Sequence, residues 1–185
     1  MPTTSDAAWP GMADALVEAL PMLRAFARSL CGDRVRADDL VQETVMRALA
    51  NRDKFLVGSN LHAWLVTILR NHFYSEGRRR SREVEDADGQ IAGHLVQQPD
   101  QEIHLEMADF MRALRLIADE QREALILVSA SGFSYEEAAA ICGVRVGTIK
   151  SRVSRARMRL LELLEDRERL PPFRPQQRSA ELVNL

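Results

Sequence analysis

Glycine and proline are scarce in this sequence, and so are the tight turns that join short strands. The 185 residues contain 9 Gly and 7 Pro, whereas alanine, leucine, arginine and glutamate are abundant. Hydrophobic residues make up 46% of the chain, which is enough for a buried core. This composition favours an all-α protein of one domain or two small ones.

The residue types that build catalytic and metal sites are equally sparse. The 2 cysteines are far apart, and neither has a cysteine or histidine partner at metal-ligand spacing. The 4 histidines form no pair four residues apart, and there is no Gly-rich phosphate loop or nucleophile motif. We therefore predict no catalytic residue, no metal and no cofactor. Cys31 and Cys142 are expected to be buried, reduced thiols.

The sequence also lacks the marks of a membrane or secreted protein. No apolar run approaches the roughly 20 residues that cross a bilayer, and the amino-terminal residues do not resemble a signal peptide. We expect a cytoplasmic protein that binds no membrane. The net charge is −2 and the pI about 6.1, which excludes a uniformly basic nucleic-acid binder. Any contact with nucleic acid must come from a local basic patch.

Apolar residues recur at helical spacing in two stretches that a polar, acidic segment separates. That segment, SREVEDADGQIAGHLVQQPDQ, has no sustained apolar period and contains 2 glycines and a proline. We therefore expect two small helical domains joined by a flexible acidic linker. The predicted parts are a loose leader (1–11), a first domain (12–82), the linker (83–104), a second domain (105–164) and a charged, loose tail (165–185).

Within the domains, the apolar period predicts individual helices and their buried residues. Leu49 is predicted to be buried in the second helix, and Phe110 in the fourth. Two further helices are predicted to follow in the second domain. The first five predicted helices cover residues 12–30, 35–51, 61–80, 102–118 and 121–129.

The stretch FSYEEAAAICGVRVGTIKSRVSRARMRL has the pattern of a helix-turn-helix. Ser134 and Glu137 have the spacing of a capping box, which marks the start of a helix. Gly143 supplies the turn, and a second helix is predicted from Val146 past Leu160. The buried stripe predicted for this second helix consists of Ile149, Val153, Ala156 and Leu160.

The remaining faces of that second helix are strongly basic. Residues 150–159 include 5 basic side chains and no acid. The major groove of DNA is about 12 Å wide and accepts one helix, in which Arg, Lys and Ser can reach base edges. Other arginines suit phosphates, which fix the register. A solvated basic face is the plain alternative, but the capped helix and the turn before it favour DNA binding.

The first domain carries a second basic cluster and an acidic face. Arginines at 78–80 and 82 follow Trp64, Phe73 and Tyr74, and aromatic surfaces beside basic groups suit opened DNA strands. For Trp64 and Phe73, core packing is the alternative. The stretch DDLVQETVMRAL presents Asp38, Asp39, Gln42 and Glu43 opposite an apolar side. Such a face would repel DNA and suits a basic protein surface.

Three stretches together resemble conserved regions two and four of bacterial sigma factors of the extracytoplasmic-function group, in the sigma-70 family. They are DDLVQETVMRAL, LHAWLVTILRNHFYSEGRRR and QREALILVSASGFSYEEAAAICGVRVGTIKSRVSRARMRL. The phrase GFSYEEAAAICGVRVGTIKSRVSRAR most resembles the subgroup that directs the general stress response of alphaproteobacteria. The resemblance implies a non-catalytic factor that recruits RNA polymerase to stress-response promoters and assists their melting. It also implies an anti-sigma protein that holds the factor inactive.

The resemblance also implies roles for individual residues. Core RNA polymerase would be bound through its β′ clamp helices and β flap, and the implied docking residues are Asp39, Gln42 and Glu43. The implied contacts with the minus-ten element of promoter DNA are Asn60, Trp64, Asn71, Arg78, Arg79 and Arg80. The implied contacts with a GGAAC-like minus-thirty-five element are Arg145, Thr148, Lys150, Ser151, Arg152, Ser154, Arg155 and Arg157.

Two other functions stay open at this point. Some stress-response regulators carry a sigma-like domain that sequesters the anti-sigma protein as a decoy, but they also carry a receiver domain, which we do not expect here. A plain helix-turn-helix regulator would need neither the acidic face nor the stretch WLVTILRNHFYSEGRRR. Binding to core polymerase separates that alternative from a sigma factor.

Overall fold

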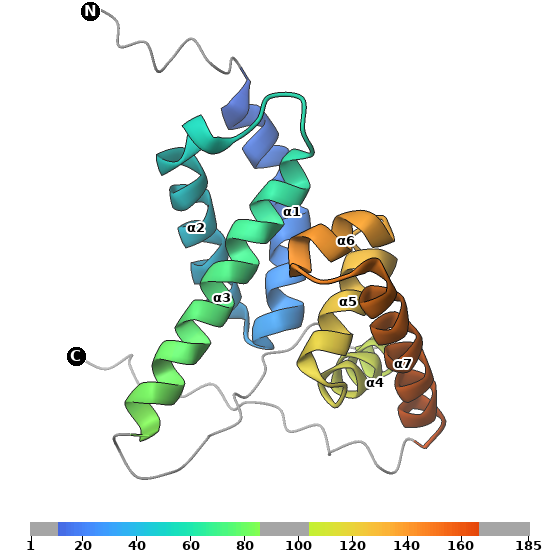
Figure 1. The fold of residues 1–185 in the computed structure, drawn as a ribbon. Coiled ribbons are helices and arrows are strands. Elements are labelled where there is room, and N and C mark those ends of the chain that lie inside the picture. The colour runs from blue at the N-terminus through green and yellow to red at the C-terminus, as the bar shows by residue number, and fades with distance from the viewer. Residues whose placement is uncertain (1–10, 86–103, 167–185) are drawn as a thin grey trace, which may run out of the picture.

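The computed structural model describes residues 11–85 and 104–166, and every regular element in these ranges is a helix (Figure 1). The first range contains α1 (Met12–Cys31), α2 (Arg34–Ala50), the 3-10 turn η1 (Arg52–Lys54) and α3 (Leu61–Glu85). The second contains α4 (His104–Arg115), α5 (Asp119–Ser129), α6 (Tyr135–Cys142) and α7 (Val146–Glu165). The all-helical prediction is confirmed, while the leader and nearly all of the linker and tail lie outside the described residues.

In the first domain, α2 packs against both α1 and α3. Gly32, in the left-handed conformation with φ 68°, ends α1, because a side chain would be strained there. Asp33 then caps α2, since its carboxylate accepts the backbone N–H of Arg36 at 2.8 Å. The largest fully buried side chains of this domain are Leu23, Phe26, Leu65 and Leu69.

In the second domain, α7 packs along α5 and against α6. The predicted capping box is present: the Glu137 N–H donates to Ser134 Oγ at 3.0 Å, and the Ser134 N–H donates to Glu137 Oε2 at 2.9 Å. Gly143, with φ 66°, makes the left-handed turn between α6 and α7. Ile149, Val153 and Ala156 are buried and Leu160 is half-buried against them, so the predicted stripe of α7 faces the core.

The two domains contact each other. Helix α5 packs against α1 and α6 packs against α3, so segments far apart in sequence lie side by side (Figure 1). Buried residues of both domains form one continuous hydrophobic cluster. We call this placement, with α5 on α1 and α6 on α3, the closed arrangement.

Three sequence predictions about the fold are wrong. The third helix was predicted to end at residue 80, but α3 continues to Glu85, because no glycine or proline interrupts the chain between Arg78 and Asp88. Leu49 is 42% exposed and Phe110 is 37% exposed, so neither belongs to the core.

None of the described helices combines the length and the apolar character that a membrane span requires.

Candidate nucleic-acid interface

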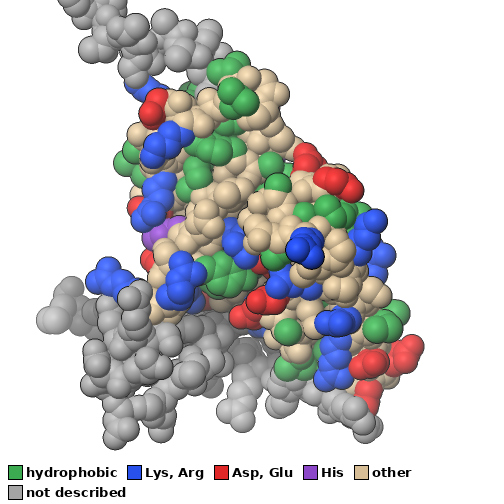
Figure 2. Space-filling view, in the orientation of Figure 1, with side chains coloured by type: hydrophobic (Ala, Val, Ile, Leu, Met, Phe, Trp, Pro, Cys, Tyr) green, Lys and Arg blue, Asp and Glu red, His purple; other side chains and the backbone are tan. Residues whose placement is uncertain are grey.

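Helix α7 presents a row of polar and basic side chains to solvent. Lys150, Ser151, Ser154 and Arg155 are exposed and share one face, because they recur at helical spacing. Arg145, at the N-cap of the helix, is exposed as well. Figure 2 shows basic side chains along the α7 side of the molecule and acidic ones gathered at its far end. This face is therefore accessible to a binding partner.

Contacts within the domain hold parts of this face in position. The Lys150 ammonium lies over the ring of Tyr135 on α6, 5.8 Å from its centroid. The Ser151 hydroxyl donates to the Thr148 carbonyl at 2.9 Å, and Thr148 itself is half-buried. Tyr135 was not among the predicted residues, although its place at the start of the capped helix offered a signal.

Two arginines that the resemblance implies as minus-thirty-five contacts, Arg152 and Arg157, have partners inside the second domain. The Arg152 guanidinium forms an ion pair with Glu120, and its side chain is only 17% exposed. Arg157 is exposed, but its Nη2 donates to Ser129 Oγ at 3.2 Å. A phosphate contact by Arg152 stays a prediction, and it would compete with the ion pair.

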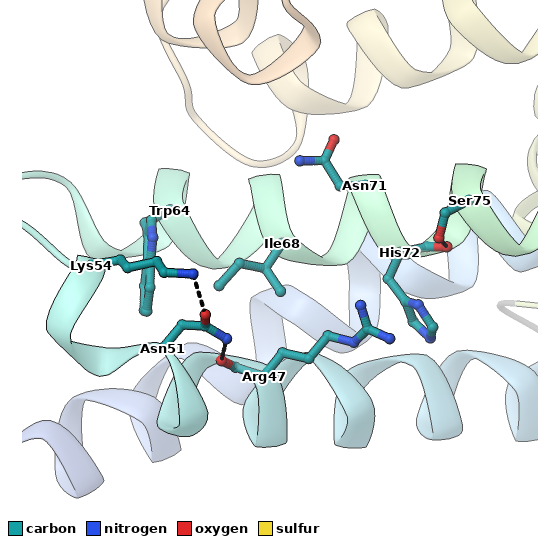
Figure 3. Close-up of a pocket in the computed structure, with 8 residues that line it drawn as sticks. All are labelled: Arg47, Asn51, Lys54, Trp64, Ile68, Asn71, His72 and Ser75. Atoms are coloured by element: carbon teal, nitrogen blue, oxygen red, sulfur yellow. Dashed lines mark hydrogen bonds between the residues drawn. The ribbon is translucent and has the colours of Figure 1, made fainter.

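A cavity of about 440 Å³ lies between α2 and α3 in the first domain (Figure 3). The side chains of Trp64, Ile68 and His72 point into it from α3. On the opposite side, Lys54 Nζ donates to Asn51 Oδ1 at 2.7 Å. The complete lining is Arg47, Asn51, Lys54, Trp64, Ile68, Asn71, His72 and Ser75. A ring-lined hollow with cations at its edge suits an unstacked nucleobase and its phosphate.

The predicted minus-ten residues lie around this cavity in different ways. Trp64 is half-buried and packs against Phe55, with 5.2 Å between ring centroids, so it serves both the core and the cavity wall. Asn71 is exposed at the rim, and its amide points toward the second domain (Figure 3). Arg78 and Arg79 are exposed further along α3, whereas the side chain of Arg80 lies outside the described residues.

Asn60 is engaged at both ends of its amide. Its Oδ1 accepts the Ala63 N–H at 3.1 Å, which caps the start of α3. Its Nδ2 donates to Glu137 Oε1 in the second domain at 2.6 Å. Backbone and side-chain hydrogen bonds from Ser134 and Asn60 lower the pKa of the Glu137 carboxyl. In the closed arrangement the Asn60 side chain is therefore hydrogen-bonded to the other domain.

A second hollow of about 440 Å³ lies between α1 and α2 and is partly acidic. Asp39 and Gln42 are exposed at this hollow, as the sequence predicts. Apolar side chains complete it, and its lining is Leu20, Arg24, Asp38, Asp39, Val41, Gln42, Val45 and Met46. Glu43 does not line it: Arg47 donates to the Glu43 carboxylate at 2.6 Å, and this hydrogen bond lowers the pKa of Glu43.

Sequence reasoning missed a buried polar cluster between the domains. Arg70 Nε donates to Glu123 Oε1 at 2.7 Å, and Tyr74 Oη donates to Glu123 Oε2 at 3.2 Å. The Arg70 guanidinium also lies 4.8 Å from the centroid of the Tyr74 ring. Burial raises the pKa of the Glu123 carboxyl, against the opposing effect of Arg70, and burial also raises the pKa of Tyr74. The phenol therefore stays protonated and keeps its role as donor.

No cluster of three or more histidine, cysteine, aspartate or glutamate side chains that could hold a metal occurs in the described ranges. Neither Cys31 nor Cys142 is in a disulfide, and both are buried. The described residues thus present one basic helix face, one ring-lined cavity and one partly acidic hollow.

Two family models match the chain, one in each domain. Residues 16–83 match sigma-70 region 2, and residues 107–160 match sigma-70 region 4. Together the two matches span most of the described residues, and each contains one of the surfaces described above.

Sigma factors are among the similar proteins and solved structures. The ECF RNA polymerase sigma factor EcfG of Rhodopseudomonas palustris (strain TIE-1) is 64% identical over 151 residues, 82% of this chain and 83% of the relative. The sigma factor RpoE of Bartonella quintana, solved in complex with the anti-sigma factor NepR, is 56% identical, with a TM-score of 0.78 over 83% of this chain and 96% of that one. CnrH, solved with the cytosolic domain of CnrY, is 26% identical, with a TM-score of 0.65 over 87% of this chain and 92% of that one.

Proposed function

Because this chain belongs to the extracytoplasmic-function sigma factors of the sigma-70 family, we propose that it directs core RNA polymerase to stress-response promoters in the cytoplasm and helps to open them. The first domain (12–82) is assigned to polymerase and the minus-ten element, and the second (105–164) to the minus-thirty-five element. Catalysis stays with polymerase, and the chain contributes specificity.

The exposed row on α7 is the single observation that carries this proposal. Lys150, Ser151, Ser154 and Arg155 follow the Gly143 turn on a helix whose opposite side is buried. Bidentate pairing of Arg or Lys with guanine would suit the two guanines of a GGAAC-like element. Arg145, at the N-cap, is positioned for a backbone phosphate.

The cavity between α2 and α3 is assigned to the opened strand of the minus-ten element. Extruding a base costs a few kcal/mol. Stacking on Trp64 and charge contacts with Lys54 and Arg47 would offset that cost. Asn60, Asn71 and the arginines at 78–80 are assigned to this element because they lie along the same helix or at its start.

The acidic hollow between α1 and α2 is assigned to polymerase. Asp39 and Gln42 combine charge and polarity with exposed apolar surface from Met46, which is 59% exposed. A basic helical surface of the clamp would complement it. The anti-sigma partner is proposed from the solved relative RpoE, which was crystallised with the anti-sigma factor NepR.

Run-off transcription tests the function. Purified core polymerase is combined with the wild-type chain or with Lys150→Ala/Arg155→Ala, on a GGAAC-type promoter and on the same promoter with that element scrambled. Glu162→Gln, an exposed carboxylate on α7 that pairs with Arg159, is the matched control. We expect specific transcripts from the wild type and the control only.

The opposite result discriminates between the alternatives. Tight anti-sigma binding without any transcript would support the decoy. Promoter binding without any association with core polymerase would support a plain helix-turn-helix regulator.

A further inference from the structure

Three sets of polar contacts join the two domains in the closed arrangement. Glu123 on α5 accepts from Arg70 and Tyr74 on α3, at 2.7 and 3.2 Å. Glu137 on α6 accepts from Asn60 at 2.6 Å. Arg115 Nη2 donates to the Gly32 carbonyl, at the end of α1, at 3.3 Å. The contacts therefore involve the carboxyl end of α1 and both the start and the middle of α3.

Of the three contacts, the one at Glu123 involves the most deeply buried charge. The Glu123 side chain is 0% exposed, and that of Arg70 is 20% exposed. A carboxylate removed from water must be paired and hydrogen-bonded to be tolerated. Among the described residues, both donors to this carboxylate come from the first domain. Loss of Arg70 or Tyr74 would therefore leave a buried carboxylate short of a donor and weaken the closed arrangement.

The contact at Asn60 blocks a residue assigned to the minus-ten element. Its Oδ1 already caps α3, so Nδ2 is the end of the amide that could reach a base edge. Glu137 Oε1 occupies that end, while Oε2 belongs to the capping box of α6. A base could pair with Asn60 only after α6 has moved away from α3.

In the closed arrangement the two domains are also too close together to reach both promoter elements. The minus-ten and minus-thirty-five elements are about 25 base pairs apart, which is about 85 Å at about 3.4 Å per base pair. A compact chain of 185 residues has a radius of gyration of about 16 Å. Two domains in direct contact cannot lie on both elements at once.

We propose that the chain inhibits itself, because Arg70 and Tyr74 of the first domain hold Glu123 of the second in an autoinhibitory contact that must break before the chain can lie along a promoter. The inhibitory consequence rests on the proposed function, whereas the contact itself does not. An anti-sigma protein would then bind an arrangement that the chain already favours.

Cys142 provides a reporter of this contact within the chain. It ends α6, which packs against α3, and it is 7% exposed. Burial, with a further effect from Glu123, raises the pKa of the Cys142 thiol from its ordinary 9.0 to about 11. Because the thiolate is the reactive form, a return to the ordinary pKa would speed alkylation at pH 8 by up to about 100-fold.

The test measures alkylation of Cys142 in the full chain with iodoacetamide at pH 8, by peptide mass spectrometry. Wild type is compared with Arg70→Met, Glu123→Gln and the milder Tyr74→Phe, with Glu162→Gln as the control carboxylate in the same domain. We expect at least about a tenfold faster reaction for the first two variants, a smaller increase for Tyr74→Phe, and no change for the control. Wild-type rates in all variants would overturn the proposal.

A double variant and a second measurement distinguish separation of the two domains from local unfolding of α6. Replacing a buried ion pair by apolar residues can preserve packing, so Arg70→Met/Glu123→Leu should return the rate to within about threefold of wild type. Small-angle scattering should show a larger radius of gyration for the single variants, with unchanged helix content by circular dichroism. Faster alkylation without this expansion would show local unfolding of α6 and would also overturn the proposal.

Transcription with limiting sigma and core polymerase then tests the inhibitory consequence. The opened variants should give more transcript than wild type at equal concentration. A promoter that stays silent with every variant contradicts the proposed function alone, because alkylation and scattering require neither DNA nor polymerase.

Discussion

The Lys150 ammonium lies over the ring of Tyr135, 5.8 Å from its centroid, and so connects the exposed face of α7 to the helix before it. Lys150 is exposed, whereas Tyr135 is half-buried against the core. The ring therefore limits the directions in which the lysine can point.

We expect Tyr135→Leu to weaken binding of a GGAAC duplex by about 0.5–1 kcal/mol, because the cation loses its aromatic support. Tyr135→Phe keeps the ring and should bind like wild type. Fluorescence anisotropy with a labelled duplex measures both, and a scrambled duplex should show no difference between them. Equal losses for Leu and Phe would show that the hydroxyl, and not the ring, matters.

Arg152 and Arg155, three residues apart on α7, should behave differently. Arg155 is exposed, so Arg155→Ala should cost about 1–3 kcal/mol of affinity for the minus-thirty-five duplex. Arg152 pairs with Glu120, which is largely exposed, so Arg152→Ala should lower the free energy of unfolding by only about 0.5 kcal/mol. Anisotropy and urea denaturation distinguish the two losses. A greater loss of DNA affinity for Arg152→Ala would mean that the ion pair breaks on DNA.

Ser134→Ala should destabilise α6 by about 1 kcal/mol, because the N–H of Glu137 loses its acceptor. A chain of this size should then melt about 2–4 °C lower. Thermal denaturation followed by circular dichroism provides the measurement. Ser59→Ala, in the exposed loop before α3, should melt like wild type. A larger loss for Ser134→Ala would indicate that the cap also supports the contact between Glu137 and Asn60.

Cys142 should make stability fall at alkaline pH. Its pKa is raised to about 11 in the folded chain from an ordinary 9.0, so the folded chain holds the thiol proton more tightly than the unfolded chain. The resulting stabilisation is fully present below pH 9, and it disappears as the pH rises from 9 through about 11. Two pKa units correspond to about 2–3 kcal/mol.

Urea denaturation between pH 8 and 11 measures this loss as the difference between wild type and Cys142→Ala, which cancels other titrating groups. The free-energy difference between the two proteins should narrow as the pH rises. A constant difference would mean that burial does not perturb the thiol.

Local sequence patterns predicted the elements of the fold well, because the interactions that set them span only a few residues. Ser134 and Glu137 are three residues apart, and the capping box expected from their spacing is present. The turn at Gly143 and the buried stripe of Ile149, Val153 and Ala156 were predicted in the same way, from residues close together in the sequence.

Contacts between distant residues could not be predicted from these patterns. Arg70 and Glu123 are 53 residues apart, and Asn60 and Glu137 are 77 apart. Glu123 looks like an ordinary surface carboxylate in the sequence, yet it is the most buried charge described. The resemblance implied Arg152 as a DNA contact, but its guanidinium pairs with Glu120, which is 32 residues away in the sequence.

In the closed arrangement some of the proposed binding surfaces are exposed and one is blocked. This difference implies an order in which partners bind. Asp39 and Gln42 at the acidic hollow and Lys150 and Arg155 on α7 are exposed, whereas Asn60 is occupied by Glu137. In the proposed function, polymerase and duplex DNA would therefore be bound while the domains still touch. Capture of the single strand would come last, so that promoter opening would act as a checkpoint on the contacts already made.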